Sequence, residues 1–126
     1  MQDKCFMCSG NLIRTEESLI CEECKVLIPL SKNFWVNETN AIVSLRNNLA
    51  QHLHALEENE ISSPEKLTKS DFTEIELWKK HNDLFYFISY FIDKRISNEF
   101  KEKELYFYLY TYKKITDEIK QFYKNN

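Results

Sequence analysis

The sequence predicts a mainly α-helical fold, in which a short N-terminal β-hairpin packs on a three-helix bundle. Glycine and proline are scarce, with one and two among 126 residues, whereas an all-β fold needs many turns. From residue 42 onward, apolar residues recur at spacings of three and four, the period of amphipathic helices. All four cysteines lie within the first 24 residues. We therefore expect a cysteine-rich module at 1–30, a linker at 31–38 and a helical domain at 39–126.

The cysteines form two pairs, CFMC at 5–8 and CEEC at 21–24. Two residues between cysteines let both sulfurs of a turn face one point, and two such turns joined by a hairpin place four thiolates around zinc. We predict one structural zinc ion, with a closed ligand set and no catalytic role, held by Cys5, Cys8, Cys21 and Cys24. Disulfides are the alternative, but they are rare in the cytoplasm, where a chain without a signal peptide is expected to stay.

This stretch resembles a zinc ribbon, and among such modules it is similar to the Gin-type anti-sigma proteins of spore formers. The similar parts are the CFMC turn and ICEECKVLI at 20–28. The resemblance implies a module that contacts other macromolecules. We expect the hairpin arms at 11–14 and 18–20. A positive φ is expected at Gly10, because backbone amides turn back toward sulfur in metal-binding turns.

The first predicted helix follows a packed linker at 31–38. It should span 39–60, because apolar residues recur there every three or four positions, and residues 37–40 offer several N-cap side chains. A short turn should then begin at Pro64, since proline favours the first position of a helix.

The second predicted helix runs over 71–96, with Asp71 as its N-cap and Glu74 as the reciprocal partner three residues later. The third runs over 99–123. We expect His54 to be exposed and His81 to lie at the edge of the core, between two aromatic residues of the same helix.

Helices two and three carry more apolar surface than a small bundle needs. The stretch LYFYLYTY at 105–112 contains a single residue that is neither aliphatic nor aromatic. It either forms a thick core or exposes an aromatic patch that binds a partner chain or closes a homodimer. For the second alternative, the predicted contact residues are Tyr106, Phe107 and Tyr110.

The stretch LRNNLAQH at 45–52 is similar to the motif of HEPN ribonucleases, an arginine and a polar residue followed by a histidine. The resemblance implies metal-independent RNA cleavage at a cleft between two chains. His52 would be the general acid and base, Arg46 would stabilise phosphate charge, and Asn47 would orient. On a helical wheel, Arg46 and His52 lie about 120° apart. Such side chains also commonly cover the edge of a core.

Charge and hydropathy narrow the function. The net charge of −3 disfavours nucleic-acid binding, and the longest apolar run, residues 84–92, is far shorter than the roughly 20 residues of a membrane span. We expect a cytoplasmic, non-catalytic regulator or inhibitor that binds a larger protein, such as transcription or phage-defence machinery. The alternatives are a HEPN-type ribonuclease and a zinc-ribbon protein that binds nucleic acid, with contacts from Lys113, Lys114, Lys120 and Lys124.

Overall fold

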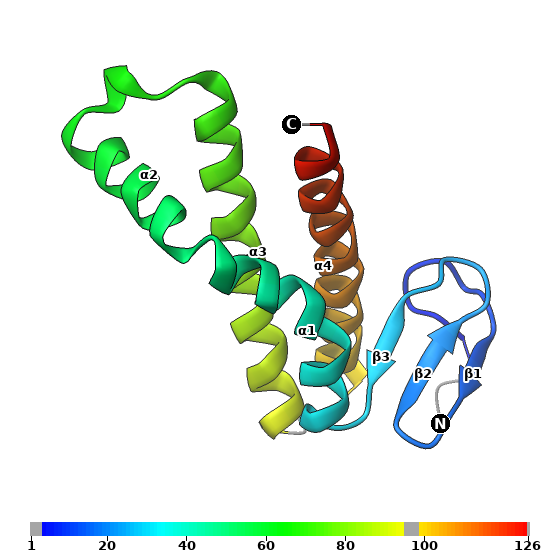
Figure 1. Ribbon diagram of the computed structural model, residues 1–126. Coiled ribbons are helices and arrows are strands. Elements are labelled where there is room, and N and C mark those ends of the chain that lie inside the picture. The colour runs from blue at the N-terminus through cyan, green and yellow to red at the C-terminus, as the bar shows by residue number, and fades with distance from the viewer. Residues whose placement is uncertain (1–3, 95–98, 126) are drawn as a thin grey trace.

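The computed structural model describes residues 4–94 and 99–125 and confirms a mainly α-helical chain with a small N-terminal antiparallel sheet (Figure 1). In chain order the elements are β1 (Leu12–Arg14), β2 (Ser18–Cys21), β3 (Leu27–Pro29), α1 (Lys32–Asn48), α2 (Ala50–Ser62), the short 3-10 helix η1 (Pro64–Lys66), α3 (Lys69–Lys94) and α4 (Glu99–Asn125). The described residues thus form four α-helices where three were expected, because the first predicted helix is divided.

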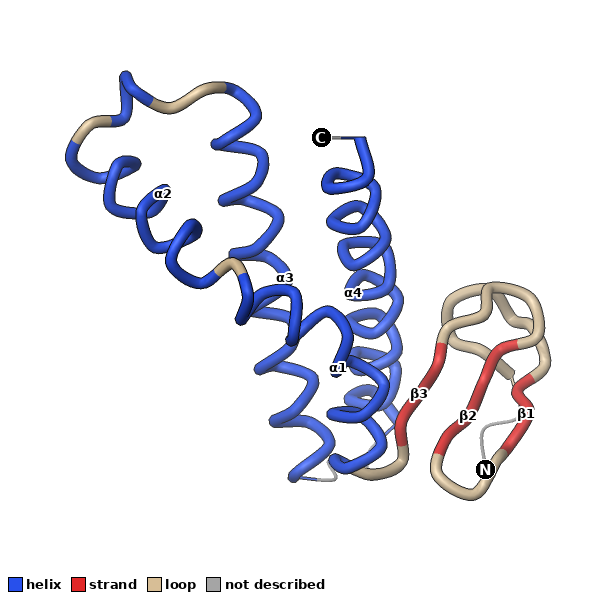
Figure 2. The backbone as a smooth tube through the Cα atoms, in the orientation of Figure 1, coloured by secondary structure: helices blue, strands red, loops and turns tan. Residues whose placement is uncertain are grey.

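The N-terminal sheet has the strand order β1-β2-β3, with both neighbouring pairs antiparallel. The two predicted arms are β1 and β2, and β3 was not predicted. It pairs with β2, with Leu19 opposite Ile28, and it also contacts α1 and α4. Figure 2 shows the three strands together on one side of the helices. We call residues 4–30 the ribbon, and β3 is the strand that joins it to the helices.

Helix α1 begins at Lys32, so the segment predicted as a packed linker at 31–38 is helical. Ser31 is the N-cap, and its hydroxyl accepts a hydrogen bond of 3.2 Å from the Phe34 amide. Trp35, Thr39 and Ile42 are buried along one face of this helix. The capping side chains at 37–40 predict a helix start there, but burial of Trp35 one turn earlier extends the helix toward the ribbon.

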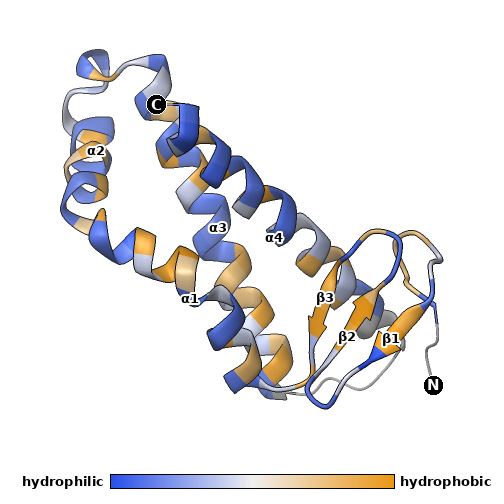
Figure 3. Cartoon of the chain, turned by 45° about the vertical axis from the view of Figure 1, so that its right-hand side comes forward, coloured by the Kyte–Doolittle hydropathy of each residue, from blue (hydrophilic) through white to orange (hydrophobic). Residues whose placement is uncertain are grey.

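The predicted helix at 39–60 is interrupted at Leu49, which ends α1 and precedes α2. Asn47 and Asn48 come directly before this break. Asparagine side chains compete for backbone hydrogen bonds and therefore favour helix ends. Helix α2 follows directly, and Figure 3 shows the chain bending between α1 and α2. The turn predicted at Pro64 is present as η1.

Helix α3 begins at Lys69, two residues before the predicted start. Its reciprocal cap joins Thr68 and Asp71. The Thr68 amide donates to the Asp71 carboxylate at 3.0 Å, and the Asp71 amide donates to the Thr68 hydroxyl at 3.1 Å. The predicted pairing of Asp71 with Glu74 is therefore wrong, because Glu74 turns into the core instead. The predicted end of this helix, at 95–96, lies outside the described residues.

Helices α3 and α4 form an antiparallel hairpin, and α1 packs across it. The shared core includes Ile88 of α3, Ile119 of α4 and Trp35 of α1. Hydrophobic residues, orange in Figure 3, gather on the strands and on the end of α3 nearest the ribbon. None of the described helices combines the length and apolar character that a membrane span requires.

Candidate metal centre

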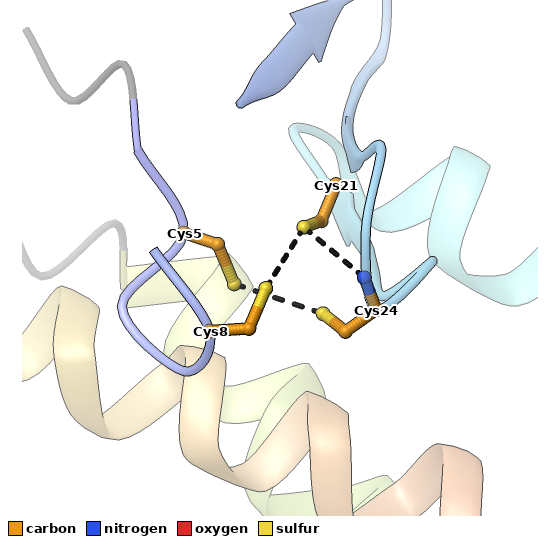
Figure 4. Close-up of side chains that lie close together, drawn as sticks. All are labelled: Cys5, Cys8, Cys21 and Cys24. Carbon is orange, nitrogen blue, oxygen red and sulfur yellow. Dashed lines mark hydrogen bonds between the residues drawn. The ribbon is translucent and has the colours of Figure 1, made fainter. Parts of the chain in front are cut away.

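The four cysteine sulfurs converge on one point, and all lie within 4.8 Å of one another. The Sγ atoms of Cys5 and Cys24 are 3.8 Å apart, and those of Cys8 and Cys21 are 3.3 Å apart (Figure 4). All four are free thiols, not two disulfides. A tetrahedron with metal–sulfur distances of about 2.3 Å has sulfur–sulfur edges of about 3.8 Å. The four cysteines therefore lie close enough together to hold a metal ion.

Each cysteine pair lies in a tight turn of similar geometry. In the first turn the Met7 amide donates to Cys5 Sγ at 3.4 Å, and in the second the Cys24 amide donates to Cys21 Sγ at 3.4 Å. Amide hydrogen bonds of this kind favour the thiolate form of the sulfur. The residue after each second cysteine has a positive φ, 64° at Ser9 and 63° at Lys25.

The prediction of a positive φ at Gly10 is wrong, because the left-handed residue is its neighbour Ser9. Gly10 is required for another reason. A Cβ atom at this position would lie 2.6 Å from Cγ of Glu23 and 3.0 Å from Sγ of Cys21. The glycine therefore lets the first turn approach the second closely enough for the four sulfurs to meet.

The thiols ionise unevenly when no cation is bound. Burial raises the pKa of Cys24 to about 12, and it also raises the pKa of Cys5. Burial acts in the same direction on Cys21, but hydrogen bonds from the Cys24 amide and the Cys8 thiol outweigh it and lower its pKa to about 7. Four neighbouring thiolates therefore need a cation to stabilise them, and soft sulfur donors select thiophilic metals.

The ribbon packs directly on α4 and covers part of the surface that was predicted to bind a partner. The ring of Phe6, from the CFMC turn, meets the ring of Tyr106 edge-on, with centroids 4.9 Å apart. Tyr106 is 3% exposed and Tyr110 is half-buried, whereas Phe107 is 52% exposed. The expectation of an exposed patch is therefore wrong for Tyr106, because the ribbon lies over it. A contact role for Phe107 stays a prediction.

Exposed aromatic rings do gather elsewhere on the helical hairpin. Phe87 and Tyr90 of α3 are 52% and 53% exposed. The Phe87 ring stacks on Tyr108 of α4 at 5.4 Å, and Phe91 lies 5.8 Å from the same tyrosine. We call this surface the aromatic face; it consists of Phe87, Tyr90, Phe91, Phe107 and Tyr108. Its α3 residues were missed as candidates, although Phe87 and Phe91 lie off the main apolar stripe at a spacing of four.

The residues of the HEPN-like motif lie on two helices. Arg46 and Asn47 end α1, and both line a cavity next to α3. His52 lies on α2, outside the lining of that cavity, and its Nε2 is 3.0 Å from a carboxylate oxygen of Glu74. The chain therefore does not bring Arg46 and His52 together in one cavity. Their catalytic role, which requires a second chain, stays a prediction.

Glu74 is the centre of a buried polar network that was not predicted. Its carboxylate accepts a hydrogen bond of 2.7 Å from the Tyr123 hydroxyl, in addition to its contact with His52. Trp78 Nε1 donates to the same Tyr123 hydroxyl at 2.8 Å. The network ties α2, α3 and α4 together at the end of the molecule that is far from the ribbon. A spacing of 49 residues between Glu74 and Tyr123 leaves no local sequence signal.

The other two histidines differ sharply in environment. His54 is exposed, as expected, and pairs with Glu58 at 3.0 Å. His81 is 1% exposed and lies inside the core instead of at its edge. Its Nε2 is 2.9 Å from the Tyr112 hydroxyl. Burial lowers the pKa of His81 to about 4, and the positive charge of Arg46 acts in the same direction.

Comparisons of this chain with known protein families, with curated proteins and with solved structures found no match. The candidate site therefore rests on the geometry of its own residues. Within the described residues, the four cysteines form the one group of potential metal ligands that converges.

Proposed function

We propose that the four cysteines bind one zinc ion with a structural role, and that the chain is a non-catalytic regulator or inhibitor that binds a larger protein. The observation that carries the proposal is the convergence of four sulfurs within 4.8 Å. Four thiolates complete a tetrahedral zinc site and leave no position for a substrate or an activated water. Such a metal supports a binding surface instead of a reaction.

The aromatic face supports the second half of the proposal. Phe87, Tyr90 and Phe107 are each about half exposed, and they adjoin one another through Phe91 and Tyr108. Aromatic residues are enriched in the energetically important centres of protein interfaces. Large exposed apolar patches on soluble proteins usually mark interaction sites. We propose a partner from transcription or phage-defence machinery; the resemblance of the two cysteine turns to anti-sigma proteins, if it reflects kinship, would imply the former.

Metal content is the first test. We expect one zinc ion per chain when the intact protein is weighed by mass spectrometry under native conditions. Removal by a strong chelator should be reversed by added zinc. A chain that stays metal-free in the presence of zinc, or one that carries a different metal when isolated from its own cells, would contradict the proposal.

Partner binding is the second test. Tagged protein should retain a specific protein from an extract of the cells that produce it, and the double substitution Phe87→Ser and Phe107→Ser should abolish that retention. The matched control is Ile61→Ser, which replaces an exposed apolar residue on α2 that is 86% exposed. Zinc content and helicity should be unchanged in both variants. Retention that survives the double substitution would show that the aromatic face is not the contact with the partner.

A further inference from the structure

A cavity lies where α1 and α2 meet α3, and the proposed function leaves it without a role. Its volume is about 390 Å³. The residues around it are Arg46, Asn47, Ala50, Leu53, His54, Glu57, Trp78, Lys79, Asn82 and Asp83. We propose that this cavity binds a small zwitterionic molecule, with its carboxylate or phosphate group on Arg46 and its ammonium group on Asp83.

Two of the titratable groups around the cavity, Lys79 and His54, are already paired. The Lys79 ammonium pairs with Glu60 at 2.7 Å, and its pKa is raised by that hydrogen bond and by the charges of Glu60 and Glu57. His54 pairs with Glu58 at 3.0 Å. Lys79 and His54 thus have carboxylate partners without a ligand, so they do not determine what the cavity accepts.

Within the described part of the chain, Arg46, Asp83 and Glu57 line the cavity without such a pair, and the charge of Glu57 acts on Lys79. Arg46 and Asp83 are therefore the opposite charges left for a ligand. Among residues 4–94 and 99–125, neither side chain forms an ion pair or a hydrogen bond. They come from different helices, α1 and α3, and they are too far apart to pair with each other. A half-buried guanidinium is a strong binder of carboxylates and phosphates, because its parallel N–H groups match two oxygen atoms. The open carboxylate of Asp83 supplies the complementary site for a cation.

A second hollow of about 140 Å³ extends the site toward the core, and Arg46, Asn47 and Asn82 line both spaces. Arg46 therefore stands where the two hollows join. The side-chain amides of Asn47 and Asn82 flank it, and each offers both a donor and an acceptor. An anionic group on Arg46 could thus receive further hydrogen bonds from these amides.

The buried imidazole of His81 is an independent sign of a missing partner. His81 lines the inner hollow, and its Nε2 is engaged by Tyr112 at 2.9 Å. Its Nδ1 is buried and has no hydrogen-bond partner within the described residues. Buried polar atoms are rarely left unpaired, so such an atom beside a hollow indicates a place for a bound group or water.

The size and the walls of the cavity narrow the ligand class. A volume of about 390 Å³ is near the lower end of the range for small-molecule sites. Trp78 and Leu53 provide an apolar wall for a short carbon skeleton. The expected ligand is a small molecule that carries one anionic oxygen group and one ammonium group. Two classes of molecule carry both groups, α-amino acids and phosphorylated amines.

Titration calorimetry on the intact, metal-loaded chain distinguishes an α-amino acid from a phosphorylated amine as the ligand. The probes are a panel of α-amino acids in one arm and O-phosphoethanolamine in the other, with inorganic phosphate and ethylamine as single-charge probes. We expect saturable binding in one arm, and binding at least tenfold weaker for the single-charge probes. Arg46→Gln and Asp83→Asn should each weaken binding at least tenfold, and Arg46→Lys should retain part of it.

Matched controls are Arg14→Gln on β1 and Asp117→Asn on α4, which remove the same charges outside the cavity and should leave binding unchanged. Zinc content and helicity should be normal in all variants, so failure of this proposal is distinguishable from failure of the metal proposal. Absence of saturable binding in both arms would overturn it, as would full binding by Arg46→Gln. Displacement of the probe by single-stranded RNA at lower concentration would assign the cavity to RNA instead.

Discussion

The ribbon and the helical hairpin reach stability by different means. In the ribbon the buried side chains are few, and two of them, Cys5 and Cys21, belong to the candidate metal centre. In the helices the buried set is mostly aliphatic and aromatic, with Ile88 and Ile119 fully enclosed. A module of this size cannot bury enough apolar surface to fold by packing alone, so under the proposed function it depends on metal coordination. The helices, in contrast, stabilise one another.

The two regions are nevertheless joined by packing. Phe6 of the ribbon covers Tyr106 of α4, and β3 contacts both α1 and α4. Val26, which precedes β3, and Ile28, which lies in β3, belong to the same core as Trp35. Loss of the metal should therefore unfold the ribbon and uncover a part of α4, while the contacts among the helices remain.

The largest expected effect is loss of the metal centre by Cys21→Ser. We expect this variant to lose zinc and to unfold residues 4–30, because structural zinc contributes on the order of 10 kcal/mol to folding. Far-ultraviolet circular dichroism should show that most helicity is retained. Amide hydrogen exchange should show loss of protection in the strands and little change in α3. Protected strands in the metal-free variant would contradict the expectation that residues 4–30 need the metal to fold.

A smaller effect is expected from a cavity in the helical core. Ile88 is 0% exposed, so Ile88→Ala should lower the free energy of unfolding by roughly 2–5 kcal/mol in urea denaturation. The matched control Ile61→Ala, at a position 86% exposed, should change it by less than about 0.5 kcal/mol. Zinc content should be normal in both. An equal effect of the two substitutions would mean that Ile88 is not part of the core.

The smallest expected effect concerns acid and acts on the helices through His81. The pKa of this group is about 4 in the folded chain against an ordinary value of 6.5, because burial disfavours the charged form. Between these values the unfolded chain holds the proton and the folded chain does not, so stability falls as pH falls. The slope should approach about 1.4 kcal/mol per pH unit, up to about 3 kcal/mol in all.

Denaturation of wild type, His81→Gln and the control His54→Gln at several pH values tests this expectation. The slope between pH 6.5 and 4 should become shallower in His81→Gln and stay unchanged in His54→Gln, since His54 is exposed. Identical slopes in all three chains would show that another group carries the acid sensitivity. Measuring amide hydrogen exchange in α3 at the same pH values reports the stability of the helical region separately from that of the ribbon.

The sequence predicts the local features of this chain well and the long-range ones poorly. The spacing of the cysteines places two sulfurs in each turn, and the turn at Pro64 depends on the backbone of a few residues. The start of α1 was missed because burial of Trp35 against other elements, not the nearby caps, determines it. The strand β3 was missed because three apolar residues become a strand only when β2 lies beside them.

The sequence by itself determined the candidate metal ligands and the mainly helical class, because both follow from spacings of two to four residues along the chain. The tertiary structure decided which aromatic rings face water. It buried Tyr106 under Phe6 and left Phe87 and Phe107 exposed, although all of these rings look alike in a sequence. It also brought His81 to Tyr112, 31 residues away, and left Arg46 and Asp83 open in one cavity. Burial and pairing depend on elements that are distant in the chain, and a local pattern does not record them.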